Sequence, residues 1–364
     1  MTARENILAV LNGRVPERIP YTPAVEGYVL KGLPDELKGM TQLEFLRHVN
    51  ADVLLRHAPV YRADVTYTGG VEISSEEDGG RITFVFKTPR GQMKEILQYT
   101  DTSPNIPFPL KRQVETLEDL KVLIYLMEHT DTAWGLTDDD YRKTEAEIGD
   151  DGVPTGSMPC TPGRMMIEGY CGVEHFYYLL ADHPSEVEAA MALIHRDRKQ
   201  LYETVCGSPV EIVIHYENTS TTTTSPRVYE RYIAPYLDEY ADMLHAAGKK
   251  MLIHNCGTLK GVADQLKRGR PDGICDIAPP PTGDLDLAEA QRLWQGKPLA
   301  IGGIDCTALA MWPEEKLRQF VRELLGRLAP GGVMLGSGDA VPFGAKVENM
   351  RAVRDEIDRF YSQA

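Results

Sequence analysis

Five short apolar segments alternate with amphipathic segments in the C-terminal half, and this alternation restricts the fold of the 364-residue chain more than any other feature. The apolar segments, each expected to form a buried strand, are residues 211–218, 251–256, 273–278, 298–304 and 333–336. Ser225-Pro226 begins the first intervening helical pattern and Gly248 ends it. Strands that alternate with helices imply right-handed crossovers and a parallel sheet. Since no Gly-x-Gly-x-x-Gly sequence follows the first strand, we expect a (β/α)8 TIM barrel, not a dinucleotide-binding fold.

The N-terminal part has a different pattern. Residues 64–74, 81–87 and 92–98 resemble an antiparallel meander joined by Gly-rich turns. We therefore expect one barrel domain, residues 1–364, with an N-terminal antiparallel β insertion at about residues 61–100. The acidic residues 138–151 are typical of a solvated helix or loop, and the Thr-rich residues 219–224 of a loop over the barrel mouth.

Composition excludes several classes of partner. The formal net charge of −15 argues against nucleic acid and against anionic membranes, because both attract basic surfaces. No apolar run approaches the ~18 residues of a membrane-spanning helix. The chain starts with a polar, helix-like sequence and its six cysteines lack a disulfide spacing, so we expect a cytoplasmic protein with free thiols. A homodimer is compatible with these features.

Polar residues follow each of the five expected strands. In chain order they are Glu217-Asn218, His254 with Cys256, Cys275-Asp276, Asp305-Cys306 and Ser337-Gly338-Asp339. The carboxyl ends of parallel barrel strands meet at one rim, where barrel enzymes hold their active sites. This distribution predicts an enzyme.

His254 and Cys256 are two residues apart at a strand end and therefore point to the same face, which makes them a zinc-type ligand pair. Asp339 and Cys275 are comparable candidates for a third ligand, with Glu217 next. Structural alternatives apply to the remaining rim residues: Cys306 as a small apolar residue, Asp305 as a helix cap and Asn218 as an anchor of the Thr-rich loop. The other histidines, His57 among them, are expected at the surface or in the core.

Several motifs resemble the uroporphyrinogen decarboxylase superfamily. They are His-x-Cys-Gly at 254–257, Pro-Pro-Pro-Thr-Gly-Asp at 279–284 followed by Leu-Ala-Glu-Ala, Gly-Gly-Ile-Asp at 302–305 and Gly-Ser-Gly-Asp-Ala-Val-Pro at 336–342. The resemblance extends weakly to Gly-Arg-x-Pro-x-Arg-x-Pro at 13–20 and is specific from about residue 210 onward. It implies the same barrel.

Within that superfamily the chain looks like the corrinoid-dependent methyltransferases. The decarboxylases resemble one another in an Arg-rich stretch after the first strand that binds substrate carboxylates, whereas residues 21–28 here contain no Arg but do contain Glu26. The methyltransferases are zinc enzymes that use His-x-Cys and a second Cys near the last strand. His254 and Cys256 match this pattern, while Ser337 stands in place of the second Cys.

The resemblance and the altered ligand set together suggest an O-demethylase. A carboxylate in place of a thiolate gives a harder zinc site, which suits the polarisation of an ether oxygen. We expect methyl transfer from a methoxylated substrate, favouring aromatic ones, to the Co(I) corrinoid of a partner protein. Glu217, Asn218 and Glu26 are the catalytic candidates; Glu217 or Glu26 would orient the substrate or supply the proton of the leaving group. The resemblance alone implies the corrinoid (cobalamin) and its partner.

Three other functions stay open. The transfer could run from the methylated corrinoid protein to a thiol or pterin acceptor, although Ser337 disfavours a thiol. A metal-independent porphyrinogen-type decarboxylase is disfavoured by the missing Arg cluster. A non-enzymatic member that only binds a corrinoid protein would contain no metal.

Overall fold

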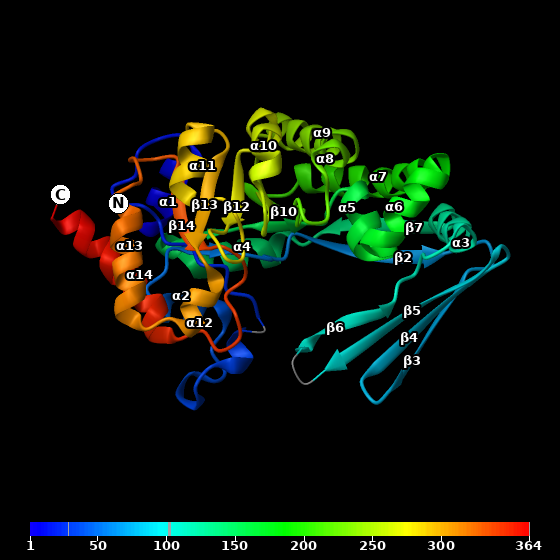
Figure 1. The fold of residues 1–364 in the computed structure, drawn as a ribbon, viewed down its shortest axis with the longest axis horizontal. Helices are drawn as coiled ribbons and strands as arrows, with labels where there is room; N and C mark the ends of the chain where they lie inside the picture. The colour runs from blue at the N-terminus through cyan, green and yellow to red at the C-terminus, as the bar shows by residue number, and fades with distance from the viewer. Residues whose placement is uncertain (28, 101–102, 364) are drawn as a thin grey trace. The chain divides into compact units, whose positions relative to one another are not determined.

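The main sheet of the computed structural model is parallel, and the structure describes residues 1–27, 29–100 and 103–363. Among these residues its strand order is β14-β13-β12-β11-β10-β9 (Figure 1). The strands are β9 Gly156–Met158, β10 Ile212–Tyr216, β11 Lys250–His254, β12 Gly273–Ile277, β13 Leu299–Ile304 and β14 Val333–Ser337. The last five coincide with the strands predicted from the sequence, so the parallel α/β architecture is confirmed.

The β14 edge of this sheet has a hydrogen-bonded neighbour, and the β9 edge continues in the chain from β8. A parallel bridge joins Leu335 of β14 to Tyr21, and the Tyr21 carbonyl accepts from the Asp52 N–H at 2.8 Å. Asp52 immediately precedes β1 Val53–Leu55, which pairs in parallel with β8 Gly152–Pro154. The chain then continues from β8 into β9 at the opposite edge of the sheet.

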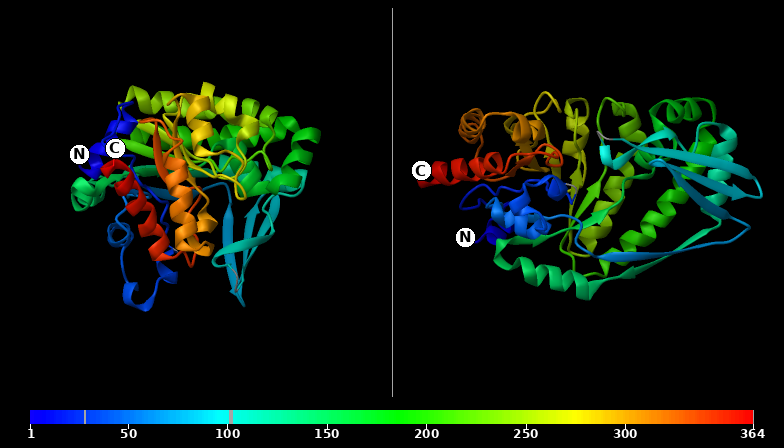
Figure 2. Two further views of the ribbon diagram at one scale, coloured as in Figure 1. Left: turned by 60° about the vertical axis from the view of Figure 1, so that its left-hand side comes forward. Right: turned by 90° about the horizontal axis from the view of Figure 1, so that it is seen from below.

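Helices follow the strands as the sequence pattern requires. They are α1 Ala3–Leu11, α2 Gln42–His48, α4 Asp138–Ile148, α8 Pro226–Tyr232, α9 Ala234–Ala246, α10 Ala263–Arg268, α11 Leu287–Trp294, α12 Cys306–Met311, α13 Glu314–Leu325 and α14 Val347–Ser362. The helix expected after Ser225 is divided into α8 and α9, because Pro235 lacks the N–H that would continue the first helix. The start of α1 and the end of α14 lie near one another in both views of Figure 2.

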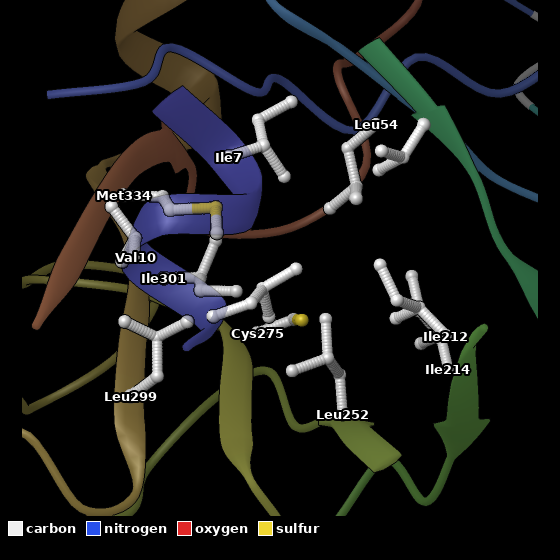
Figure 3. Close-up of a cluster of buried hydrophobic side chains, with 12 residues drawn as sticks. Ile7, Val10, Leu54, Ile212, Ile214, Leu252, Cys275, Leu299, Ile301 and Met334 are labelled. Atoms are coloured by element: carbon white, nitrogen blue, oxygen red, sulfur yellow. The ribbon is translucent and has the colours of Figure 1, made fainter. Parts of the chain in front are cut away.

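The inner face of the parallel strands is filled by aliphatic side chains (Figure 3). This core cluster consists of Ile7, Val10, Leu11, Leu54, Val153, Ile212, Ile214, Leu252, Cys275, Leu299, Ile301 and Met334. Alternate residues of β10 and of β13 contribute to it, as the two-residue period of a strand dictates.

A second compact unit comprises residues 61–136 and 160–205, and thus extends beyond the insertion expected at about residues 61–100. Its four-stranded antiparallel sheet has the order β3-β4-β5-β6, with β3 Glu72–Asp78, β4 Arg81–Thr88, β5 Gly91–Thr100 and β6 Ser103–Lys111. Its helices are α3 Leu117–Glu128, α5 Pro162–Met165, a π-helix Met166–Cys171, α6 Gly172–Asp182 and α7 Pro184–Cys206.

The antiparallel strands differ from the predicted meander in one respect. The segment expected as a single strand over residues 64–74 forms two strands, β2 Tyr61–Tyr67 and β3, because Gly69 and Gly70 take positive φ between them. β2 pairs with β7 Thr130–Leu136 instead of with β3. Within the described residues, no helix is both long and apolar enough to cross a membrane.

Candidate metal centre

His254, Cys256 and Asp339 converge at the carboxyl end of the parallel strands. One ligand atom of each residue lies within 4.8 Å of the ligand atoms of the other two. His254 is the last residue of β11, Cys256 lies two residues after it, and Asp339 lies two residues after the end of β14. The side chain of His254 is buried, whereas Cys256 and Asp339 are half-buried.

A buried carboxylate and a buried guanidinium orient His254. Asp276 Oδ2 contacts His254 Nδ1, and Arg56 donates to both oxygens of Asp276 at 2.8 and 2.7 Å. Burial alone would raise the pKa of Asp276, but the charges and hydrogen bonds of Arg56 and His254 more than offset it and hold that pKa well below its usual range. A carboxylate on Nδ1 leaves Nε2 as the donor atom for a metal, the arrangement common around zinc-bound histidines.

A β-bulge brings Asp276 to this position. The register between β12 and β13 shifts between Ile274 and Ile277, and Asp276 within the shift has a φ of 67°. A bulge turns a side chain away from the regular alternation of the strand. The bulge therefore places the Asp276 carboxylate beside the imidazole of the neighbouring strand.

The electrostatics of the three ligand residues fit a divalent cation. Burial raises the pKa of the Cys256 thiol, and the carboxylates of Asp339 and Asp276 raise it further. A bound cation would reverse this effect, because a thiol that coordinates zinc loses its proton. Imidazole, thiolate and carboxylate are all accepted zinc ligands, so the residues present fit zinc.

Cys275, one of the two candidates for a third ligand, lies apart from the other predicted ligands. Its Cα is the register partner of His254, but its sulfur lies among the aliphatic side chains of the core cluster (Figure 3). The residue is fully buried and is not part of the group formed by the three ligand residues. This position is typical of a small apolar side chain and lies apart from the three grouped ligand residues.

The three predicted catalytic residues have different positions. Glu217 is fully buried and its Oε2 lies 2.8 Å from Nε2 of His215, whose ring packs near Tyr240 of α9. Asn218 has a φ of 51°, and its N–H donates to the His254 carbonyl at 3.0 Å, in the turn after β10. Glu26 contacts His57, as described below.

Other rim residues have structural partners. The Ser337 hydroxyl accepts from the Ala24 N–H at 2.9 Å and so joins the end of β14 to the segment after Tyr21. Asp305 is the N-cap of α12 and also accepts from Thr282, as the capping alternative predicted. Burial raises the pKa of Cys306 to about 11, with Asp339 the next cause, so this thiol lies near the ligand residues without joining them.

The structure adds four residues that sequence reasoning missed. Nδ1 of His57 lies 2.7 Å from Ser157 Oγ, and its Nε2 lies 3.1 Å from both Glu26 Oε2 and Tyr216 Oη. The ring of Tyr216 stacks on His57 at 4.9 Å between centroids and lies 5.2 Å from the ring of His254. The fourth is Arg56. His57 and Arg56 follow β1, a strand of three residues that is too short to produce a periodic pattern.

Comparison with known proteins identifies the family. The uroporphyrinogen decarboxylase (URO-D) family matches residues 98–360. The chain belongs to this family. No curated protein gives a significant match to the sequence.

Two solved structures show how the URO-D fold of this chain compares with others. A methyltransferase from Methanosarcina mazei has a TM-score of 0.65 and 14% sequence identity, covering 99% of both chains. A B12-independent methionine synthase from Shewanella sp. W3-18-1, solved with selenomethionine, has a TM-score of 0.52 and 12% identity, covering 95% of this chain and 98% of that one. At these identities the similarity establishes the fold.

Proposed function

We propose that this URO-D family protein is a zinc-dependent methyltransferase of the O-demethylase type. It would move a methyl group from a methoxylated substrate, with aromatic ethers the favoured class, to the Co(I) corrinoid of a partner protein. The observation that carries the proposal is the convergence of His254, Cys256 and Asp339 within 4.8 Å at the carboxyl end of the parallel strands. We also infer that the strands close into a (β/α)8 barrel through the Tyr21 bridge and the β1–β8 pair.

The donor set favours an oxygen substrate. When bound, zinc would act as a Lewis acid that polarises the ether oxygen and so makes the methyl carbon more susceptible to attack. One thiolate with one carboxylate makes a harder site than two thiolates, and hard sites prefer oxygen. Ser337 cannot supply the second thiolate and its hydroxyl accepts from Ala24.

The residues around the ligands hold the site in one geometry. Asp276, which Arg56 holds by two hydrogen bonds, fixes the orientation of His254. The ring of Tyr216 packs near the imidazole of His254. Arg56 is engaged on both oxygens of Asp276, so it is not available for a substrate carboxylate. Arg56 therefore gives no support to the alternative function, a decarboxylase whose substrate carries several carboxylates.

The first test is the metal content of the purified protein, measured by elemental analysis. We expect about one zinc per chain and its loss in a His254→Ala/Cys256→Ala double variant. A His245→Ala/Cys206→Ala variant is the matched control, because neither residue belongs to the ligand group. Absence of zinc from wild-type protein purified with added zinc would contradict the proposal.

The second test is methyl transfer with a reduced corrinoid protein and a panel of methoxylated aromatics. His254→Ala should abolish the transfer, and turnover by a variant that still binds zinc tightly would refute the assignment. The reverse assay starts from the methylated corrinoid protein with thiol or pterin acceptors. Turnover only in the reverse assay would replace demethylation by methylation of an acceptor.

A further inference from the structure

Resting on this proposed function, we propose that His57 is the general acid that protonates the oxygen from which the methyl group leaves. Sequence reasoning gave this task to Glu217 or Glu26. Glu217 is fully buried against His215, whereas His57 has a side chain that is 48% exposed and so accessible to a substrate. Glu26 contacts His57 at 3.1 Å and therefore acts through it.

Three hydrogen-bonding groups from three elements hold the imidazole of His57. Ser157 on β9 contacts Nδ1 at 2.7 Å, while Nε2 faces Tyr216 at the end of β10 and the carboxylate of Glu26, each at 3.1 Å. When the ring is protonated, Nδ1–H donates to the Ser157 hydroxyl and Nε2–H to the Glu26 carboxylate, and the second bond is charge-assisted. The arrangement thus accommodates an imidazolium, the form that an acid catalyst needs.

The backbone of His57 supports a functional reading. Its φ is 60°, in the left-handed region that non-glycine residues seldom adopt. Such strain persists where the surrounding structure fixes it, and it is concentrated at active sites. The preceding residue, Arg56, instead donates to Asp276 and so supports His254. Of these two consecutive residues, Arg56 therefore acts on a ligand residue and His57 acts at the rim.

The position of His57 relates it to the ligand residues through one aromatic ring. The ring of Tyr216 stacks on the ring of His57 and also packs near the ring of His254. Burial raises the pKa of Tyr216, which therefore stays a neutral hydrogen-bond partner. A general acid delivers its proton directly or through one water, so the proposal requires the ether oxygen to lie on the side of the ligand residues that faces His57.

The proposed step cleaves the ether bond heterolytically. The carbon–oxygen bond of the ether breaks and its electron pair remains on oxygen, while both electrons of the new carbon–cobalt bond come from the Co(I) corrinoid of the partner. The proton on His57 passes to the leaving oxygen, which departs as an alcohol or phenol. The imidazole becomes neutral and regains a proton from solvent, to which it is half-exposed.

The test compares leaving groups in wild type and in His57→Asn. Asn is chosen because it tolerates positive φ, so the backbone of residue 57 is preserved. For anisoles whose phenols are weak acids, we expect methyl transfer to fall by about 10²- to 10³-fold. For nitroanisoles, whose nitrophenolate leaves without a proton, we expect a loss of less than about threefold. His245→Asn is the matched control, since His245 also contacts a carboxylate, that of Asp272 at 2.8 Å.

Two measurements besides turnover separate this inference from a structural role. Zinc content should be unchanged in His57→Asn, and the NMR signals of the His57 ring should move in Glu26→Gln, which alters the contacting carboxylate, but not in the His245→Asn control. An equal loss for all leaving groups, or no loss, overturns the role of His57 while leaving methyl transfer intact. Failure of wild type to demethylate any ether overturns the proposed function and this inference with it.

Discussion

At the residue scale, two side chains that do not bind the metal decide the orientation of one that does. Asp276 contacts Nδ1 of His254, and Arg56 satisfies both oxygens of Asp276 in a fully buried pair. Removal of Arg56 would leave a buried carboxylate with His254 as its remaining partner and without its compensating charge, which is more costly than the loss of an exposed ion pair. The pair therefore stabilises the site and the fold together.

Asp276→Asn tests this orienting contact. Asn keeps the size and tolerates the φ of 67°, but its amide is a weaker acceptor for the Nδ1–H of His254. We expect zinc affinity to fall by about 10- to 100-fold, as measured by competition with a chelator. Unchanged affinity would show that Asp276 serves only to pair with Arg56.

Cys275→Ser tests whether Cys275 belongs to the ligand set. The sulfur lies in the aliphatic core, so zinc content by elemental analysis should equal that of wild type. The buried hydroxyl would lack a partner among these side chains, and we expect the free energy of unfolding to decrease by about 1–3 kcal/mol. Loss of zinc without loss of stability would restore Cys275 as a ligand.

At the element scale, the close approach of β12 and β13 determines the bulge that carries Asp276. A Cβ added to Gly302 of β13 would lie 2.5 Å from the carbonyl oxygen and 2.6 Å from the nitrogen of Ile277. Only glycine allows this approach, and Gly302 also has a φ of 137°. The Gly-Gly-Ile-Asp sequence is thus required by strand packing as well as by the turn that follows.

Gly302→Ala should destabilise the protein by about 3 kcal/mol or more, because the clash is with backbone atoms that cannot move aside. Gly344→Ala is the control: its φ is 83°, but no atom lies within 4 Å of the added Cβ. The control should lose only the cost of a left-handed conformation, about 1–2 kcal/mol, in denaturant unfolding. Equal losses would mean that conformation, not packing, selects glycine at residue 302.

The junction between β13 and α12 should depend on pH. Burial would raise the pKa of Asp305, but hydrogen bonds from Thr307 and Thr282 lower it below its usual value. A carboxyl with a depressed pKa stabilises the fold above its unfolded pKa of about 4, and this contribution is lost as pH falls through the folded value. The Tm difference between wild type and Asp305→Asn should therefore be largest above about pH 5 and shrink towards pH 3. A difference that does not vary with pH would exclude ionisation as its origin.

At the whole-molecule scale, the two compact units differ in how deeply their strands are buried. All five residues of β12 are buried, whereas all seven residues of β3, an edge strand of the antiparallel sheet, are exposed. In hydrogen exchange followed by mass spectrometry, β3 should exchange orders of magnitude faster than β12. Comparable protection of β3 would show that another chain covers this edge in solution.

The sequence by itself determined the elements and half of the site. Strand and helix periods are local properties, so five parallel strands could be located, and the two-residue spacing of His254 and Cys256 puts them on one face of a strand. The polar residues at strand ends likewise predicted the rim at which Asp339 joins the pair.

Only the tertiary structure decided which of these rim residues meet. Cys275 and Asp339 were equivalent in sequence, but the side chain of Cys275 lies in the aliphatic core, whereas Asp339, in the loop after β14, lies beside His254 and Cys256. His57 follows a three-residue strand, so no local period could indicate its contacts with Glu26, Ser157 and Tyr216. Long-range register and a bulge, which depend on neighbouring strands, are not encoded in any short window of sequence.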